Sequence, residues 1–262
     1  MSNFQYLSAS AVDEAAAKVK GAQDGALLAG GMTLLPSIKL GLSSPSDLVD
    51  LAGIGDLSGI SAKGGTVTIG AMTCHADVAS SSDVPAALAA LASGIGDPQV
   101  RNRGTIGGSL ANNDPAADYP AACLALGATI NTDQRSISAN DFFTGFFETA
   151  LGEGEIITSA EFPSAEKAAY QKFTNPASRF ALVGVFVASG SDGVRVAVTG
   201  CGQGGVYRET GLEEALAANF SADALDGKTV SSDNLMSDMH AAADYRAHLI
   251  VEMAKRAVAA CE

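Results

Sequence analysis

The sequence has few cysteines and histidines, the residues that most often bind transition metals. Its 262 residues include three histidines and four cysteines, and the cysteines are widely spaced: Cys74, Cys123, Cys201 and Cys261. A zinc or iron–sulfur site needs clustered ligands, so the sequence predicts no metal site within this chain. Dispersed cysteines are also typical of reduced thiols, which favours a cytoplasmic location.

Basic residues are scarce as well. Sixteen lysines and arginines stand against 29 acidic residues, which gives a net charge of −13. A nucleic-acid-binding protein needs a basic footprint, and an anionic membrane surface attracts basic segments, so we expect neither partner. Net charge does not decide local fields, however, and a cluster of backbone N–H groups can still bind a phosphate.

Long apolar runs are absent too. No apolar stretch approaches the roughly 18 residues of a membrane-spanning helix. Residues 1–10 lack the basic and apolar regions of a secretory signal. We therefore expect no membrane span and no signal peptide.

What the sequence does contain is apolar residues and glycine. A chain that is 47% hydrophobic and 17% charged is typical of a globular protein. Its 29 glycines exceed the usual share of about 7% and follow no fixed period, so they indicate many turns and close backbone contacts. The length fits one large domain or two to three small ones.

Short strands and helices alternate in the first part of the chain. The predicted elements are strands at 4–8, 25–31 and 46–52 and helices at 8–22 and 33–41, with Ser10 as the expected cap of the first helix. They predict a β-α-β-type unit of about 55 residues.

The rest of the chain mixes antiparallel strands with helices. Turn signals predict a hairpin around residues 63–65 and a second one whose strands meet at residues 190–193. The other predicted elements are a short helix from Thr73, a helix at 83–96 capped by Asp83, a helix and strand within 121–132, a strand at 154–163 and a long amphipathic helix at 237–262.

Two glycine segments have the composition of an anion-binding loop. In residues 27–36, LLAGGMTLLP, an apolar strand runs into Gly30-Gly31, where free N–H groups can approach negative oxygens. In residues 104–120, GTIGGSLANNDPAADYP, glycines are followed by hydroxyl, amide and carboxylate side chains. Taken alone, each segment also fits an ordinary turn, and we interpret the second as glycine-rich, polar turn structure.

Other candidate sites are weaker. Residues 200–205 spell G-x-G-x-x-G after a strand, but that strand belongs to a hairpin and too few residues follow to build a dinucleotide fold. We interpret them as a glycine-rich strand end. His75, His240 and His248 have no evident nucleophilic partner, and we expect all three to be structural. Asp114 and Asp118 lack the regular spacing of a metal site.

Together, AGGMTLLP and RGTIGGSLANNDPAADYP, about 75 residues apart, resemble the FAD-binding medium subunits of the molybdenum hydroxylases, which include aerobic carbon monoxide dehydrogenase and xanthine dehydrogenase. The resemblance extends over nearly the whole chain, through TIGAMTCHADVA, EIITSAEFP and the closing helix. It implies an α+β fold: a two-part FAD-binding domain of the vanillyl-alcohol-oxidase-like type at 1–57 and 58–164, then a C-terminal α+β domain with an antiparallel sheet and helices at 165–262.

The resemblance also implies which residues bind FAD. Two loops would hold the pyrophosphate, Asp118 would contact the polar middle of the cofactor, Ile157 and Ile95 would line the pocket, Lys172 would reach the flavin, and Phe180 would pack on its ring. The loop residues are Ala29, Gly30, Gly31, Met32, Thr33 and Leu34 on one side and Gly104, Thr105, Gly107, Gly108, Ser109 and Ala111 on the other. No residue is expected to be catalytic and none to bind a metal.

The sequence departs from the family pattern at two places. Met32 stands where histidine or glutamine is common, and Arg179-Phe180 stands where an Asp-Tyr pair is frequent. A backbone cradle tolerates the first change, and Phe180 lacks a phenol to donate. We expect these changes to affect the flavin potential or the choice of electron acceptor.

By resemblance, the function is electron relay. A small subunit with [2Fe–2S] clusters would pass electrons to FAD, and FAD would reduce an external acceptor, while a large molybdopterin subunit oxidises the substrate. The expected assembly is a dimer of heterotrimers in the cytoplasm. The alternatives are a free-standing flavin-dependent oxidoreductase of the same fold and a binding module that has lost FAD.

Overall fold

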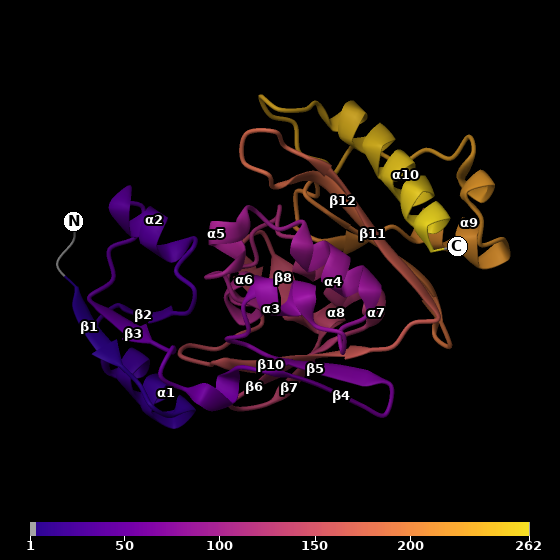
Figure 1. The fold of residues 1–262 in the computed structure, drawn as a ribbon. Helices are drawn as coiled ribbons and strands as arrows, with labels where there is room; N and C mark the ends of the chain where they lie inside the picture. The colour runs from indigo at the N-terminus through magenta and orange to yellow at the C-terminus, as the bar shows by residue number, and fades with distance from the viewer. Residues whose placement is uncertain (1–3, 262) are drawn as a thin grey trace.

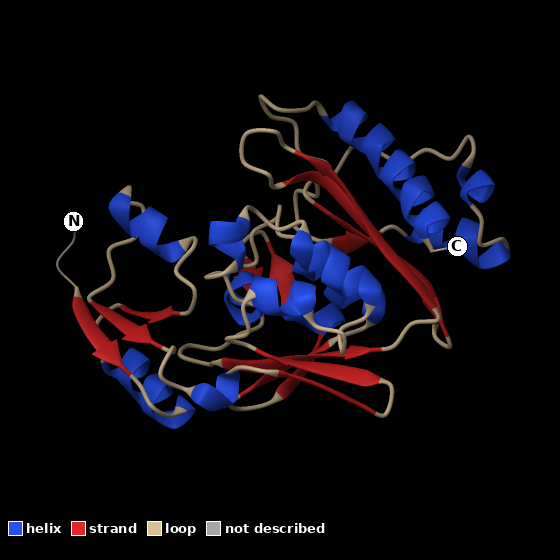
Figure 2. Cartoon of the chain, viewed as in Figure 1, coloured by secondary structure: helices blue, strands red, loops and turns tan. Residues whose placement is uncertain are grey.

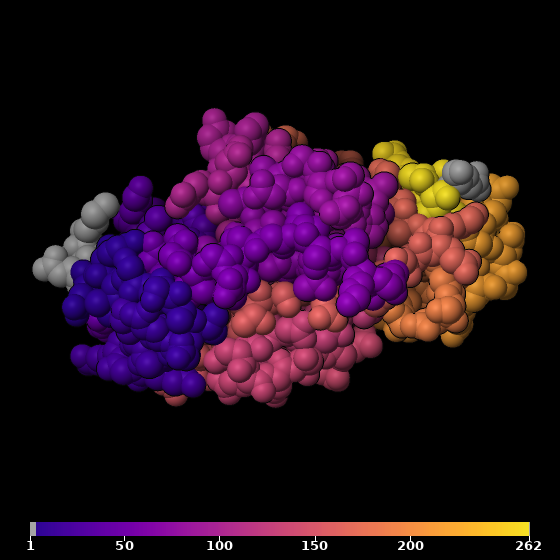
Figure 3. Space-filling model, turned by 60° about the horizontal axis from the view of Figure 1, so that its bottom comes forward, coloured from indigo at the N-terminus to yellow at the C-terminus, as the bar shows by residue number. Residues whose placement is uncertain are grey.

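Three larger sheets, a small two-stranded sheet and the helices around them make up the structure (Figures 1 and 2). It is a computed structural model that describes residues 4–261. The N-terminal and C-terminal parts lie at opposite ends of the molecule, as the space-filling view also shows (Figure 3). The middle of the chain lies between them.

The N-terminal sheet is parallel and has the strand order β1-β3-β2. Its elements are β1 (Gln5–Ser8), α1 (Val12–Gly21), β2 (Gly25–Leu28), α2 (Leu34–Lys39) and β3 (Asp47–Asp50). The predicted β-α-β order is confirmed, but the predicted cap is wrong. The N-cap of α1 is Ala11, and Ser10 instead donates from its N–H and its hydroxyl to Glu14 Oε2, both at 2.8 Å.

The second sheet is antiparallel, with the order β4-β5-β10-β6-β7. Its strands are β4 (Ile60–Lys63), β5 (Thr66–Gly70), β6 (Thr129–Thr132), β7 (Ser136–Ser138) and β10 (Ile157–Pro163), and the 3-10 turn η1 (Gly55–Leu57) precedes it. In β5, Val67 and Ile69 point to the same face because side chains alternate along a strand, and both are buried. This face holds the largest apolar core of the molecule.

Six short helices cover that core: α3 (His75–Ser80), α4 (Ala86–Ser93), α5 (Pro98–Arg101), α6 (Ile106–Asn112), α7 (Tyr119–Leu126) and α8 (Ala139–Phe142). A small hairpin, β8 (Phe143–Gly145) and β9 (Glu148–Thr149), follows them. Every residue of α7 is buried because the helix contacts strands of both the second and the third sheet. Pro85, and not Asp83, is the N-cap of α4, and α3 starts two residues after the predicted Thr73.

The third sheet is antiparallel, with the order β11-β12-β13-β14. It consists of β11 (Lys167–Thr174), β12 (Ala181–Gly190), β13 (Gly193–Thr199) and β14 (Tyr207–Arg208), and α9 (Thr210–Ala218), η2 (Ala222–Leu225) and α10 (Ala243–Ala260) follow. Helix α10 covers one face and α7 the other, which explains why β12 is apolar and buried on both sides.

The C-terminal helix is shorter than predicted. It begins at Ala243 instead of residue 237 and ends at Ala260, and the predicted end, residue 262, lies outside the described residues. Arg246, which is 2% exposed, ties the helix to the sheet by donating to the carbonyls of Leu182 and Gly200 at 2.8 and 2.9 Å. The segment before the helix is bonded to the same guanidinium through Asp238 at 2.8 Å, so it runs as a loop over Arg246.

Candidate functional site

The two glycine segments lie against each other beside one cavity of about 450 Å³. A Cβ atom on Gly30 would lie 1.9 Å from the carbonyl oxygen of Arg103, so the N-terminal loop contacts the backbone before Gly104 directly. Only a glycine permits this approach. The cavity therefore lies where the N-terminal unit meets the middle of the chain.

All the predicted FAD-binding residues except Lys172 line this cavity. They come from segments far apart in the sequence: the loop after β2, the turn after α4, helix α6 with the residues just before it, the segment before α7, strand β10 and the turn before β12. The structure thus brings the predicted set together, and its contact with a cofactor remains a prediction.

The N-terminal loop provides free hydrogen-bond donors. Strand β2 ends at Leu28, and Gly31 has a φ of +74°, which lets the chain turn into α2. Within the described residues, the N–H groups of residues 30–34 have no hydrogen-bond acceptor. Successive unpaired N–H groups in a turn form a concave anion-binding surface.

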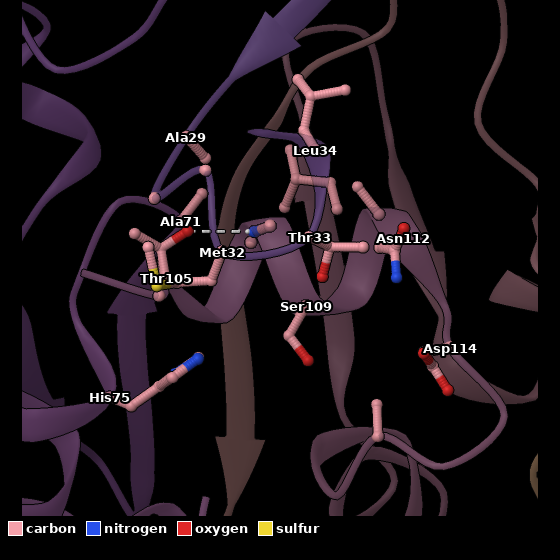
Figure 4. Close-up of a pocket in the computed structure, with 18 of the residues that line it drawn as sticks. Ala29, Met32, Thr33, Leu34, Ala71, His75, Thr105, Ser109, Asn112 and Asp114 are labelled. Atoms are coloured by element: carbon pink, nitrogen blue, oxygen red, sulfur yellow. Dashed lines mark hydrogen bonds between the residues drawn. The ribbon is translucent and has the colours of Figure 1, made fainter. Parts of the chain in front are cut away.

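The second glycine segment is helical at residues 106–112, so its interpretation as a turn is wrong there. Thr105 Oγ1 caps α6 by accepting from Gly108 N–H at 3.1 Å. The Ile106 N–H donates to the Thr73 carbonyl at 3.1 Å. The Gly107 N–H donates to the Ala71 carbonyl at 2.8 Å, the bond drawn as a dashed line in Figure 4. Two glycines disfavour a helix, and for that reason the sequence predicted a loop here. The Thr105 cap and the two backbone bonds offset that cost.

The α6 wall therefore differs from the N-terminal loop in what it offers a ligand. Its first N–H groups already have acceptors inside the protein. What remains is the open Cα of Gly108 and the hydroxyl of Ser109, which points into the cavity in Figure 4. One wall supplies donors, and the other supplies close approach and a single hydroxyl.

Behind the cavity, Asp118 forms a buried cluster with Tyr170 and Lys172. The Tyr170 hydroxyl donates to Asp118, and Lys172 Nζ lies 3.0 Å from Asp118 Oδ1, with both charged side chains less than a tenth exposed. Burial raises the pKa of Asp118, and the Lys172 charge and the hydrogen bonds oppose that rise. Lys172 does not itself line the cavity.

Lys172 also holds two loops at that end of the cavity. Its Nζ donates to the carbonyls of Gly94 at 2.8 Å and Arg179 at 3.3 Å. The neighbouring residues Ile95 and Phe180 both line the cavity, and Phe180 is 46% exposed. The lysine thus fixes the backbone on both sides of the predicted ring-binding region.

Polar residues after α6 shape the next turn. Asn113 ends the helix with a φ of +41° and donates from Nδ2 to the carbonyls of Gly145 and Glu148, at 3.0 and 2.7 Å. Asp114 accepts from Ala116 N–H at 2.9 Å, and burial raises its pKa. In residues 4–261, no three His, Cys, Asp or Glu side chains are placed to hold a metal ion.

Sequence reasoning missed several lining residues, above all Ala71, Met72, His75, Val100 and Arg179. His75 was expected to be structural, yet it lies on the cavity wall and is 5% exposed. Cys74 pairs with Thr105 in an isolated β-bridge, which brings His75 beside Gly104. Because this contact joins residues about 30 positions apart, nothing in the local sequence indicates it.

Comparisons with known proteins identify the family of this chain. Residues 2–165 match the family model described as FAD binding domain in molybdopterin dehydrogenase. The carbon monoxide dehydrogenase medium chain of Hydrogenophaga pseudoflava is 34% identical, over 97% of this chain and 96% of that one. The nicotine 6-hydroxylase medium subunit of Paenarthrobacter nicotinovorans is 32% identical, with the same coverage.

A solved structure shares the whole fold. The carbon monoxide dehydrogenase from Hydrogenophaga pseudoflava has a chain that superposes with a TM-score of 0.89 at 35% identity, covering 99% of this chain and 97% of that chain. The predicted α+β class, with a FAD-binding part followed by a C-terminal α+β part, is confirmed. No helix within residues 4–261 has the length and apolar character needed to cross a membrane.

Proposed function

This chain belongs to the FAD-binding medium subunits of the molybdenum hydroxylases, and from that premise we propose that it relays electrons within such a complex. It would take them from a small [2Fe–2S] subunit and pass them through FAD to an external acceptor. Oxidation of the substrate would take place in a large molybdopterin subunit. The family makes the chain a flavoprotein part of an oxidoreductase, and the direction of electron flow is our proposal.

The observation that best supports the proposal is that the N-terminal loop and helix α6 face the same cavity. One presents consecutive unpaired N–H groups at residues 30–34, and the other presents the bare Cα of Gly108 across the same cavity. A dinucleotide cofactor needs this combination because its pyrophosphate is anionic and wide. The chain has a net charge of −13, which does not favour the binding of anions in general. A local group of N–H donors is therefore a more specific indication of an anion site than it would be in a basic protein.

The residues of this chain would bind and orient the cofactor. The N–H groups of residues 30–34 would hold the pyrophosphate, and Ser109 would donate or accept beside it. The apolar side chains Ile95, Ile157 and Phe180 would exclude water from the ring. FAD, when bound, supplies the redox chemistry, since it accepts and stores one or two electrons.

The need for an iron–sulfur partner subunit is inferred from the positions of the cysteines in this chain. Cys123 and Cys201 are buried in different cores, so their thiols do not converge on a cluster. Iron–sulfur ligands would therefore come from another subunit. We propose a dimer of heterotrimers, and the wide spacing of the four cysteines along the chain supports the expectation of a reducing, cytoplasmic compartment.

Co-expression tests this proposal. The chain is produced alone and together with a small iron–sulfur and a large molybdopterin subunit, and native mass spectrometry measures the stoichiometry. Rapid mixing with a reductant of the iron–sulfur subunit then measures flavin reduction. We expect equal amounts of the three chains and flavin reduction that requires the small subunit. A chain that oxidises a substrate unaided would support the free-standing alternative.

A further inference from the structure

His75 is a buried polar side chain on the wall of the cavity. It is 5% exposed, and in Figure 4 its nitrogen-bearing edge points into the cavity, toward Ser109. Its backbone N–H donates to the Gly104 carbonyl at 3.0 Å. The imidazole is therefore held beside the glycine loop that the proposed function assigns to the cofactor.

The space for this ring depends on Gly104. A Cβ atom at residue 104 would lie 2.6 Å from His75 Nε2, which is too close for any other residue type without a shift of the imidazole. On its other side the ring packs on Tyr119, with 5.4 Å between ring centroids and 47° between the planes. The imidazole is thus fixed between the Tyr119 ring and the backbone of Gly104, which has no side chain.

The hydrogen bonds of this imidazole are not made within the protein. Only two fully buried side-chain polar atoms in residues 4–261 lack a partner, and they are His75 Nδ1 and the Tyr119 hydroxyl oxygen. The other ring nitrogen, Nε2, lies beside Gly104 at the wall of the cavity. The ring thus spends none of its buried hydrogen-bonding capacity at Nδ1, and an oxygen that accepts from Nε2 would add one net hydrogen bond, worth roughly 0.5–1.5 kcal/mol of binding energy.

The imidazole ring of His75 is neutral near pH 7, and its surroundings indicate which of the two ring nitrogens carries the proton. Burial and, to a smaller extent, the Arg101 charge lower the pKa of His75 to about 4. A neutral imidazole has one N–H donor and one acceptor nitrogen. An N–H without an acceptor is rarer in protein interiors than an under-used acceptor, which favours a bare Nδ1 and an N–H at Nε2.

We propose that His75 donates a hydrogen bond from Nε2 to an oxygen of bound FAD next to the pyrophosphate. The inference rests on the proposed function and adds a residue to it. Its place beside Gly104 and Thr105 sets the acceptor as a phosphate or ribityl oxygen, since the second loop faces that part of the cofactor in the proposal. His75 is then a neutral donor in a chain whose other cavity donors are mostly backbone N–H groups.

Two substitutions separate hydrogen bonding from packing. His75→Phe keeps an aromatic ring against Tyr119 and removes the donor, whereas His75→Gln keeps a donor and removes the ring. His248→Phe is the matched control because His248 is exposed on α10, in the C-terminal part of the chain. The FAD dissociation constant is measured on each deflavinated protein, as full chain and as co-expressed complex, and thermal unfolding is followed by circular dichroism.

We expect His75→Phe to weaken FAD binding about ten-fold, the value of one net hydrogen bond. His75→Gln should stay within about three-fold of the wild type, and His248→Phe should not change the constant. Wild-type affinity in His75→Phe would overturn the inference, as would equal losses in the Phe and Gln variants, which would indicate packing alone.

An NMR measurement on the wild-type chain covers the case in which a variant does not fold. The ¹⁵N shifts of the three imidazoles report tautomer and hydrogen bonding. Addition of FAD should move the Nε2 signal of His75 and leave His240 and His248 unchanged, and an unmoved His75 signal in the FAD-bound chain contradicts the inference. If no preparation binds FAD at all, the proposed function itself fails, and the two failures are thereby distinguished.

Discussion

At the scale of single residues, the adjacent glycines 107 and 108 have different reasons to be glycine. A Cβ on Gly107 would lie 2.6 Å from Ala71 Cβ, inside the packing of α6 on the second sheet. A Cβ on Gly108 would meet Thr105 Oγ1 at 3.0 Å and Ala29 Cβ at 3.4 Å, at the cavity wall. The first glycine is needed for folding and the second for the space that a ligand would occupy.

We therefore predict different outcomes for Gly107→Ala and Gly108→Val. Gly108→Val should leave a folded chain that retains no FAD, because a β-branched side chain would occupy the space of the pyrophosphate. Gly107→Ala should lower the free energy of unfolding by about 1–3 kcal/mol, as overpacking does. FAD content and urea unfolding measure the two effects, and normal FAD occupancy in Gly108→Val would refute the placement of the pyrophosphate.

At the scale of elements, three segments meet at Lys172. Its ammonium contacts Asp118 at the start of α7, the Gly94 carbonyl after α4 and the Arg179 carbonyl before β12. Arg179 has a φ of +64° and lies 3.6 Å from Asp97, which joins the same two loops near the surface. The buried contacts of Lys172 and the surface ion pair between Arg179 and Asp97 therefore both hold the end of the cavity that contains Phe180.

Lys172→Met should break this junction. Removal of one partner of a buried ion pair leaves an uncompensated charge, which costs about 3–5 kcal/mol of unfolding free energy. The double variant Lys172→Met with Asp118→Asn should recover part of that loss, because neither charge remains. Urea unfolding of the four proteins of this double-mutant cycle gives the coupling energy, and additive losses would contradict the ion pair as the source of the effect.

The sequence predicts some of these elements well and others poorly, for physical reasons. Two strands of the third sheet, β12 and β13, were predicted because their β-branched residues form two apolar runs that are largely buried, whereas β11 and β14 were not predicted. Helix α6 was missed because its stability comes from the Thr105 cap and from bonds to residues 71 and 73, which local propensity cannot reveal. Helix α10 begins six residues later than predicted because Arg246, in its first turn, bonds to Asp238 and holds the preceding segment as a loop.

The same distinction applies to the cavity. Its glycine loops were predicted from motifs within the sequence, because close backbone approach needs glycine itself. His75 was not predicted as a lining residue, since only the pairing of Cys74 with Thr105 places it there. Residues that reach a site through tertiary contacts leave no local pattern.

At the scale of the whole molecule, buried titratable groups make stability depend on pH. The folded protein holds the pKa of His75 at about 4, below its ordinary 6.5, so the unfolded chain takes up a proton first as the pH falls. The Arg135 hydrogen bond lowers the pKa of Glu155 to about 2 from 4.5, so its contribution is present above pH 4.5 and lost toward pH 2. Both groups therefore destabilise the fold in acid, in successive windows.

The first window gives a prediction for the FAD-free chain. Between pH 6.5 and pH 4 the wild type should lose about 3 kcal/mol of unfolding free energy through His75. His75→Phe should lose less over that interval, because phenylalanine does not titrate. Urea midpoints across the interval measure both proteins, and parallel curves for the two would show that His75 is not the group responsible.

The central claim is that the cavity between the N-terminal loop and α6 holds FAD in an electron-relay subunit. The most direct test is the visible absorption spectrum of the purified chain, taken alone and in a complex with its co-expressed partners, followed by identification of the released chromophore. The account predicts flavin bands and close to one FAD for each copy of this chain in the complex. A colourless complex that contains the iron–sulfur subunit would contradict it.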